Sequence, residues 1–143
     1  MKLLKHALNR RNIQIVFFSI YLCFMIWMTL LSRTQYPHRV VRMELFWAFR
    51  RWLAGSENGF AESIQYIMNI LFFVPFGFLF PQKKSVVKVL LFAFFTSLFI
   101  EISQYIYVLG ECEIDDLISN TLGAFIGSFV YKFVENIQES RGD

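Results

Sequence analysis

Long apolar runs alternate with shorter polar connections along this chain, and four of the runs are long enough to cross a bilayer. They cover about residues 13–31, 64–80, 86–108 and 117–134. A membrane-spanning helix needs roughly 17–25 mostly apolar residues, and each run lies close to this range. The pattern predicts an all-α membrane protein, with residues 1–143 forming a single domain of four transmembrane helices.

The longest connection, residues 34–63, has an amphipathic centre. On a helical wheel its apolar side chains gather on one side, at Val41, Leu45, Ala48, Phe49, Trp52 and Leu53. Its charged side chains gather on the other, at Arg39, Glu44, Arg50 and Arg51, while Arg42 interrupts the apolar arc. This pattern is typical of a helix in the membrane interface with its aromatic rings at head-group depth. We therefore expect an interfacial helix over about residues 39–53, between the first and second spans.

Composition and charge narrow the function classes. The chain is 56% hydrophobic and 19% aromatic, with 18 Phe, which is too apolar for an ordinary soluble domain. The net charge of +3 comes from basic residues between the apolar runs, so they determine topology, and we expect no nucleic acid partner. Cys23 and Cys112 have no metal-ligand spacing, and we expect neither a metal centre nor a cofactor.

Polar side chains recur inside the last two apolar runs, where charge is costly. Glu101 and Gln104 share one face of the third run, and Asp115 and Asp116 stand at the start of the fourth, with Asn120 four residues after Asp116. An ionisable residue inside a span is a functional-site hypothesis by default. The alternative is that these carboxylates only pair with an arginine and hold helices together.

Antiparallel threading of four helices brings the polar groups into the same half of the bilayer. Span one ends at Arg33, span two carries Asn69 near its start, and the polar groups of spans three and four meet at the same end. We expect a polar pocket roofed by the interfacial helix. Its candidate residues are Arg33, Arg50, Asn69, Glu101, Gln104, Asp115, Asp116 and Asn120. We expect the stripe of Ser119, Gly123 and Gly127 to serve helix packing instead.

Three segments resemble the VanZ-like family of small bacterial membrane proteins, named for a teicoplanin-resistance accessory protein. They are NILFFVPFGFLFP from Asn69, IEISQ from Ile100 and EIDDLISNTLGAFIG from Glu113, and the similarity covers nearly the whole chain. The resemblance implies that the family's polar positions are Asn69, Glu101, Gln104, Asp115, Asp116 and Asn120. Family members usually carry an arginine shortly before the acidic motif, but residues 108–112 contain none. Any such role would pass to Arg33 or Arg50, or be absent from this chain. The resemblance implies a cell-envelope context and supplies no reaction.

Three functions remain open at this point, and no catalytic residue is assigned. The first is a cell-envelope protein whose outer-leaflet pocket binds an anionic lipid or a lipid-linked wall precursor, with an effect on susceptibility to teicoplanin-type glycopeptides. Arginine side chains are well suited to bind the phosphate of such a lipid. The second is a metal-assisted enzyme acting on a lipid phosphate, with Glu101, Asp115 and Asp116 holding Mg²⁺ or Ca²⁺. The third is a structural bundle that partners an envelope protein complex.

The basic residues predict the orientation of the chain in the bacterial cytoplasmic membrane. With both termini in the cytoplasm, nine of the fourteen basic residues lie inside and five lie outside, as the positive-inside rule favours. We expect reporter fusions at Lys84 and Asp143 to read as cytoplasmic and one at Gly55 as external. An external signal at Lys84 would overturn this topology.

Overall fold

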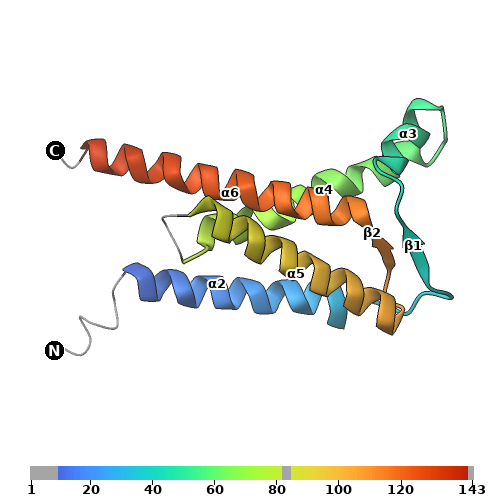
Figure 1. Ribbon diagram of the computed structural model, residues 1–143, viewed down its shortest axis with the longest axis horizontal. Helices are drawn as coiled ribbons and strands as arrows, with labels where there is room; N and C mark the ends of the chain where they lie inside the picture. The colour runs from blue at the N-terminus through green and yellow to red at the C-terminus, as the bar shows by residue number, and fades with distance from the viewer. Residues whose placement is uncertain (1–9, 82–84, 142–143) are drawn as a thin grey trace.

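The computed structural model describes residues 10–81 and 85–141, which form a bundle of four long helices with a small cap at one end (Figure 1). The helices are α2 (Arg10–Ile26), extended by the π-helix η1 (Trp27–Leu31), α4 (Gly59–Leu79), α5 (Val86–Tyr107) and α6 (Ile114–Arg141). All four are long and apolar enough to cross a membrane. The predicted all-α membrane fold is confirmed. Lys84 and Asp143, two of the reporter positions, lie outside the described residues.

The bundle is held at its centre by the contact between α4 and α6, whose backbones touch. A Cβ added at Gly77 would lie 2.0 Å from the carbonyl oxygen of Ala124, and one at Gly127 would lie 1.9 Å from that of Val74. A Cβ at Gly123 would lie 2.2 Å from the carbonyl oxygen of Ile70. Small residues allow this approach, and close packing is what associates helices in lipid. The glycine stripe therefore serves packing, as its spacing predicts.

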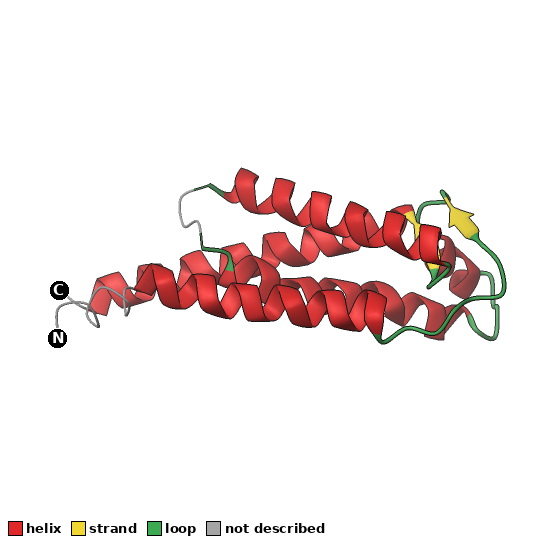
Figure 2. Ribbon diagram, turned by 90° about the horizontal axis from the view of Figure 1, so that it is seen from below, coloured by secondary structure: helices red, strands yellow, loops and turns green. Residues whose placement is uncertain are grey.

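Helix α2 joins the bundle through aromatic side chains. Phe18 packs edge-on against Phe76 with ring centroids 5.0 Å apart, and the Tyr21 hydroxyl donates to the carbonyl of Phe72. Beyond Ile26 the helix widens into η1, where Ser32 N–H donates to the carbonyl of Trp27, five residues back, at 2.8 Å. The long helices run side by side and their connections gather at the ends (Figure 2).

The cap differs from the predicted interfacial helix. The helix between the first two spans is confirmed, but α3 covers only Trp47–Leu53. Residues Val40–Arg42 instead form strand β1, which pairs in parallel with β2 (Glu111–Glu113). The helix prediction was therefore wrong for residues 39–46. Phe46 has a left-handed backbone with φ of 53°, so a right-handed helix cannot continue back through it.

The ends of the spans also differ from their predicted positions. Helix α4 begins at Gly59 rather than 64, and α6 covers Ile114–Arg141 rather than about 117–134. Gly59 allows a close contact at the start of α4, because a Cβ there would lie 2.5 Å from the backbone of Trp52. This contact brings α3 directly against the first turn of α4. The early start of α6 puts both aspartates in its first turn.

We expect Gly127→Ala to destabilise the bundle, because its Cβ would meet backbone that cannot move aside. Overpacking of this kind costs about 1–3 kcal/mol. The measurement is the thermal unfolding midpoint in detergent. Gly110→Ala is the matched control, since the nearest atoms to its added Cβ are 3.6 Å away. Equal midpoints for the two variants would contradict close packing at the α4–α6 contact.

Candidate functional site

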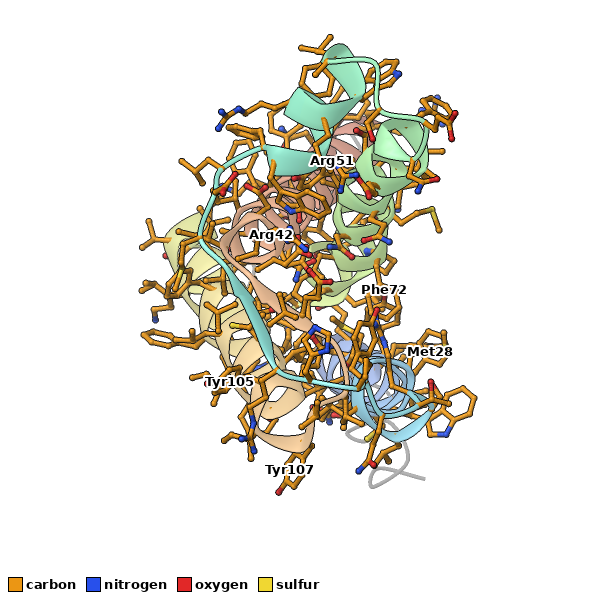
Figure 3. The ribbon with its side chains drawn as sticks, turned by 90° about the vertical axis from the view of Figure 1, so that its right-hand side faces the viewer. Met28, Arg42, Arg51, Phe72, Tyr105 and Tyr107 are labelled. Atoms are coloured by element: carbon orange, nitrogen blue, oxygen red, sulfur yellow. The ribbon has the colours of Figure 1, made fainter. Side chains whose placement is uncertain are left out.

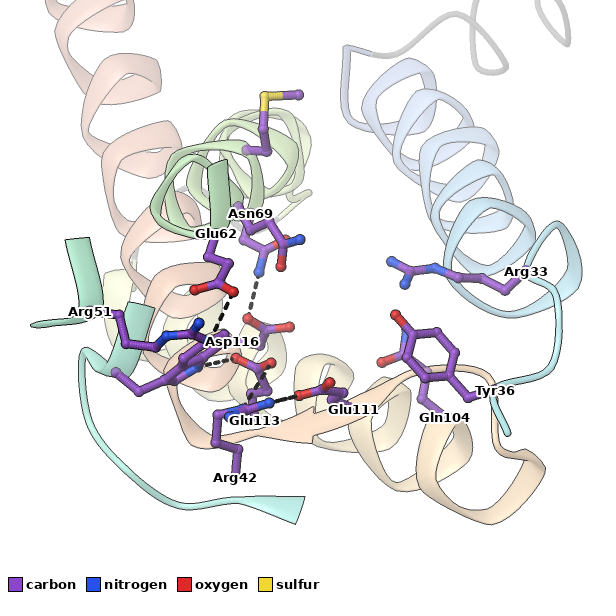
Figure 4. Close-up of a pocket in the computed structure, with 13 residues that line it drawn as sticks. Arg33, Tyr36, Arg42, Arg51, Glu62, Asn69, Gln104, Glu111, Glu113 and Asp116 are labelled. Atoms are coloured by element: carbon purple, nitrogen blue, oxygen red, sulfur yellow. Dashed lines mark hydrogen bonds and ion pairs between the residues drawn. The ribbon is translucent and has the colours of Figure 1, made fainter. Parts of the chain in front are cut away.

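A cavity of about 590 Å³ lies at the cap end of the bundle, and most of its lining is polar or charged (Figure 4). Its volume is within the usual range for small-molecule sites. The lining comes from every part of the cap and from the adjoining ends of the helices. The residues are Arg33, Tyr36, Arg42, Trp47, Arg51, Glu62, Gln65, Met68, Asn69, Gln104, Glu111, Glu113 and Asp116.

Side chains from neighbouring helices join at the floor of the cavity. Asn69 Nδ2 on α4 donates to Asp116 Oδ1 on α6 at 2.6 Å. Gln104 Nε2 on α5 donates to the carbonyl of Thr29 in η1 at 3.1 Å. Glu101 is 2% exposed, and its Oε2 accepts from the backbone N–H of Glu113 at 2.9 Å. These bonds fix the relative positions of all four helices where the cavity begins.

Two of the arginines in the lining are already paired with carboxylates. Arg42 donates through Nε and Nη2 to Glu111 Oε2, and its guanidinium lies 3.8 Å from the centre of the Trp47 ring. Arg51 Nη1 lies 3.0 Å from Glu62 Oε1. Seen from the cap end, both arginines reach toward the centre of the molecule (Figure 3). Their charges are therefore largely neutralised inside the protein.

Arg33 differs from the other two arginines of the cavity. It follows η1, is exposed, and extends toward the cavity from the side opposite Arg51 (Figure 4). Within the described ranges 10–81 and 85–141, no carboxylate oxygen lies within 4.0 Å of its guanidinium nitrogens. Among the described residues, Arg33 is thus the cavity arginine that has no paired carboxylate.

The adjacent aspartates of α6 point in different directions. Asp116 lines the polar cavity, whereas Asp115 is 2% exposed and accepts from the Tyr66 hydroxyl at 2.5 Å. That hydroxyl in turn accepts from the backbone N–H of Ala48 at 3.3 Å. Asp115 therefore joins α6 to α4 and α3. Asp116 and Asn120, four residues apart on α6, also have different roles. Asp116 lines the cavity, whereas Asn120 is buried and donates to Ser97 Oγ at 2.8 Å.

The different directions of Asp115 and Asp116 argue against the hypothesis that Glu101, Asp115 and Asp116 together hold one cation. Asp115 is engaged by Tyr66, away from the cavity that Asp116 lines. Among the residues described, no group of three or more His, Cys, Asp or Glu side chains is arranged to hold a metal ion.

The comparisons with known proteins agree with this architecture. The family model described as VanZ/LLP1 matches residues 18–135. Protein VanZ from Enterococcus faecium is 31% identical over 123 residues, which cover 79% of this chain and 70% of that protein. The chain belongs to the VanZ/LLP1 family. The resemblance inferred from the three motifs is confirmed, and the chain is a multi-pass membrane protein. No solved structure matches it.

The candidate residues of this VanZ/LLP1 protein divide into three groups. Arg33, Asn69, Gln104 and Asp116 line the cavity, and Glu101 lies behind its wall. The other three lie elsewhere. Asp115 and Asn120 join helices, and Arg50 is exposed on α3 outside the lining.

Sequence reasoning missed much of the lining. The missed residues are Tyr36, Arg42, Trp47, Arg51, Glu62, Gln65, Met68, Glu111 and Glu113. The sequence did contain a signal for three of these residues, Arg42, Glu111 and Glu113. Arg42 broke the apolar arc of the predicted helix, and Glu111 and Glu113 alternate as residues on one face of a strand do. Both signs favour a strand at these positions.

Glu113 lies just before the fourth span and lines the cavity. Burial raises its pKa to about 7. The indole N–H of Trp47, which donates to Glu113 Oε2 at 2.7 Å, and the guanidinium of Arg42 act against this rise. The carboxylates of Asp116 and Glu111 add to it. Glu113 therefore changes charge near neutral pH, in direct contact with the cavity.

We expect stability in detergent to fall as pH rises from about 5 to 8, in part because of Glu113. Since its folded pKa of about 7 exceeds its ordinary value, the protonated form is favoured in the folded protein. Its stabilising contribution is complete below the unfolded pKa and is lost as pH rises through 7. Glu113→Gln should make the dependence of the thermal midpoint on pH shallower. An unchanged slope would show that Glu113 is not buried as described.

Proposed function

We propose that this VanZ-family protein binds the head group of a lipid-linked wall precursor, with the phosphate of that head group on Arg33. The observation that supports this proposal is the asymmetry among the cavity arginines. Arg42 and Arg51 are paired with carboxylates, whereas the guanidinium of Arg33 has no such partner among the described residues. Guanidinium groups bind phosphate through paired, charge-assisted hydrogen bonds.

The remaining lining favours a head group with few charges and many hydroxyls. The cavity contains three arginines and the four carboxylates of Glu62, Glu111, Glu113 and Asp116. A densely anionic head group would meet more repulsion than attraction there. Carboxylates and amides such as Gln65 instead suit the hydroxyl and amide groups of a sugar. This balance favours a glycan linked to lipid by phosphate over a simple polyanionic lipid.

The proposed orientation has the cavity in the outer leaflet of the bacterial cytoplasmic membrane and both termini in the cytoplasm. The cap and cavity lie at one end of the bundle, and the described residues nearest both termini lie at the other (Figure 1). The excess of basic residues on the terminal side supports this arrangement. A ligand resident in the outer leaflet would then reach the cavity without crossing the bilayer.

Retention of a wall precursor would also connect the cavity to glycopeptides. These antibiotics act on wall precursors outside the cell, so a protein that holds the precursor head group would limit its exposure. We propose this as the route by which the chain affects susceptibility to teicoplanin-type compounds. The similarity to Protein VanZ of Enterococcus faecium supports examining this effect. The proposal assigns no catalytic residue.

We expect Arg33→Gln to weaken binding of a polyprenyl-phosphate-linked sugar by roughly 10–100-fold, as loss of a charge-assisted contact predicts. The measurement is the Kd of the purified protein in nanodiscs. Arg50→Gln is the matched control, because this exposed arginine lies outside the cavity lining. If both variants bind like the original chain, or if a polyprenol of equal length binds as tightly, phosphate recognition by Arg33 is wrong.

We expect Glu101→Gln and Asp116→Asn to insert and accumulate normally yet retain less precursor than the original chain. Each amide still offers an oxygen to its donor, the Glu113 N–H or Asn69 Nδ2. Only the charge is removed. Abundance in the membrane, thermal midpoint and lipid co-purification are measured on the same samples. If both variants unfold, the carboxylates serve helix packing, and if both retain the precursor fully, they have no part in binding.

A further inference from the structure

A second cavity, of about 450 Å³, lies beneath α3 and has an almost wholly apolar lining. Its wall is formed by side chains on the membrane-spanning helices α4 and α6, including Ile67 and Leu122, which are 57% and 45% exposed. Phe49 and Trp52 of α3 close its upper side. We call this space the α3 groove. None of its lining residues contributes to the polar cavity.

Helix α3 is held over the groove by hydrogen bonds at its buried side. Ala48 N–H donates to the Tyr66 hydroxyl, and that hydroxyl donates to Asp115 Oδ2. Tyr66 and Asp115 both lie in the wall of the α3 groove. The aspartate that does not face the polar cavity therefore helps to fix the position of α3 over the groove.

The level of the α3 groove in the membrane indicates what fills it. Along α6 it extends from Asp115 to Leu122, about 10 Å of helix measured from the outer end of the span. At this depth the groove opens on the faces that the spans present to lipid. Hydrocarbon is the medium there, so a lipid chain can enter sideways and cover the aromatic underside of α3.

A charge at the edge of the α3 groove selects the lipid. Arg50 directly follows Phe49, which lines the groove, so its backbone lies beside the groove. Arg50 is exposed and has no carboxylate oxygen within 4.0 Å in the part of the chain that the structure describes. An anionic head group complements it.

We infer that the α3 groove binds one chain of an anionic bilayer phospholipid, with its phosphate on Arg50. This site is separate from the polar cavity and does not depend on the function proposed for it. A bound lipid would fill the space under α3 and stabilise the roof of the polar cavity from outside. It also gives Arg50 a ligand of its own.

Native mass spectrometry of the full chain in mild detergent tests this site. The probe is an equimolar mixture of phosphatidylglycerol and phosphatidylcholine with identical acyl chains. We expect the original chain to retain phosphatidylglycerol preferentially, and Ile67→Trp, which fills the α3 groove, to lose this lipid. Leu71→Trp is the matched control, because Leu71 is also 57% exposed but lies outside the groove. Leu122→Trp fills the groove from its other wall and replaces Ile67→Trp should that variant misfold.

Charge variants separate the two sites. Arg50→Gln should lower retention of phosphatidylglycerol about fivefold relative to phosphatidylcholine, as loss of one interfacial charge predicts. Arg33→Gln should leave it unchanged. Retention of phosphatidylglycerol by both groove-filling variants, or its loss in Arg33→Gln, would overturn the inference. So would dimers that disappear in Ile67→Trp, since the groove would then be an interface between two copies.

Discussion

The cost of a carboxylate inside a membrane governs how the cap of this protein is built. Glu101, Asp115 and Asp116 lie within spans, and each must find hydrogen-bond donors in the protein because lipid offers none. The donors are the Glu113 N–H of β2 and, from α4, the Tyr66 hydroxyl and Asn69 Nδ2, and Tyr66 in turn accepts from the Ala48 N–H of α3. Satisfying these acids therefore fixes β2, α3 and the first half of α4 against the ends of α5 and α6. The polar cavity is the space left when this network is complete.

The four spans were predictable because the bilayer itself imposes their pattern. A helix that crosses hydrocarbon needs a long apolar run, and such runs are visible without any tertiary information. The same reasoning brought Arg33, Asn69, Gln104 and Asp116 to one end of the bundle, where the structure has them. Antiparallel threading was sufficient for this result because consecutive spans of one chain cross the bilayer in opposite directions.

The cap was not predictable in the same way, because its geometry depends on partners far away in the sequence. Val40 pairs with Glu111, and no local pattern shows which two short strands pair or in which direction. Without this pairing, Arg42 was assigned to a helix and its contact with Glu111 was missed. For the same reason, the sequence could not show that Arg51, rather than the predicted Arg50, lines the cavity. They are neighbours on α3, and only the orientation of that helix determines which one reaches the cavity.

The π-helix at the end of the first span controls the direction of Arg33. Residues Trp27–Leu31 form a wide turn that is closed by a hydrogen bond from the Ser32 N–H to the carbonyl of Trp27. Within this turn, the carbonyl of Thr29 accepts a hydrogen bond from Gln104. A wide turn of this kind contains one residue more than an α-helical path would need. Winding the same residues as an ordinary α-helix would rotate everything after the turn by about 100°, because the extra residue would no longer be absorbed. Arg33 would then leave the cavity while the span still crossed the bilayer. The wide backbone of this one turn is therefore under constraint, as well as the identity of its side chains.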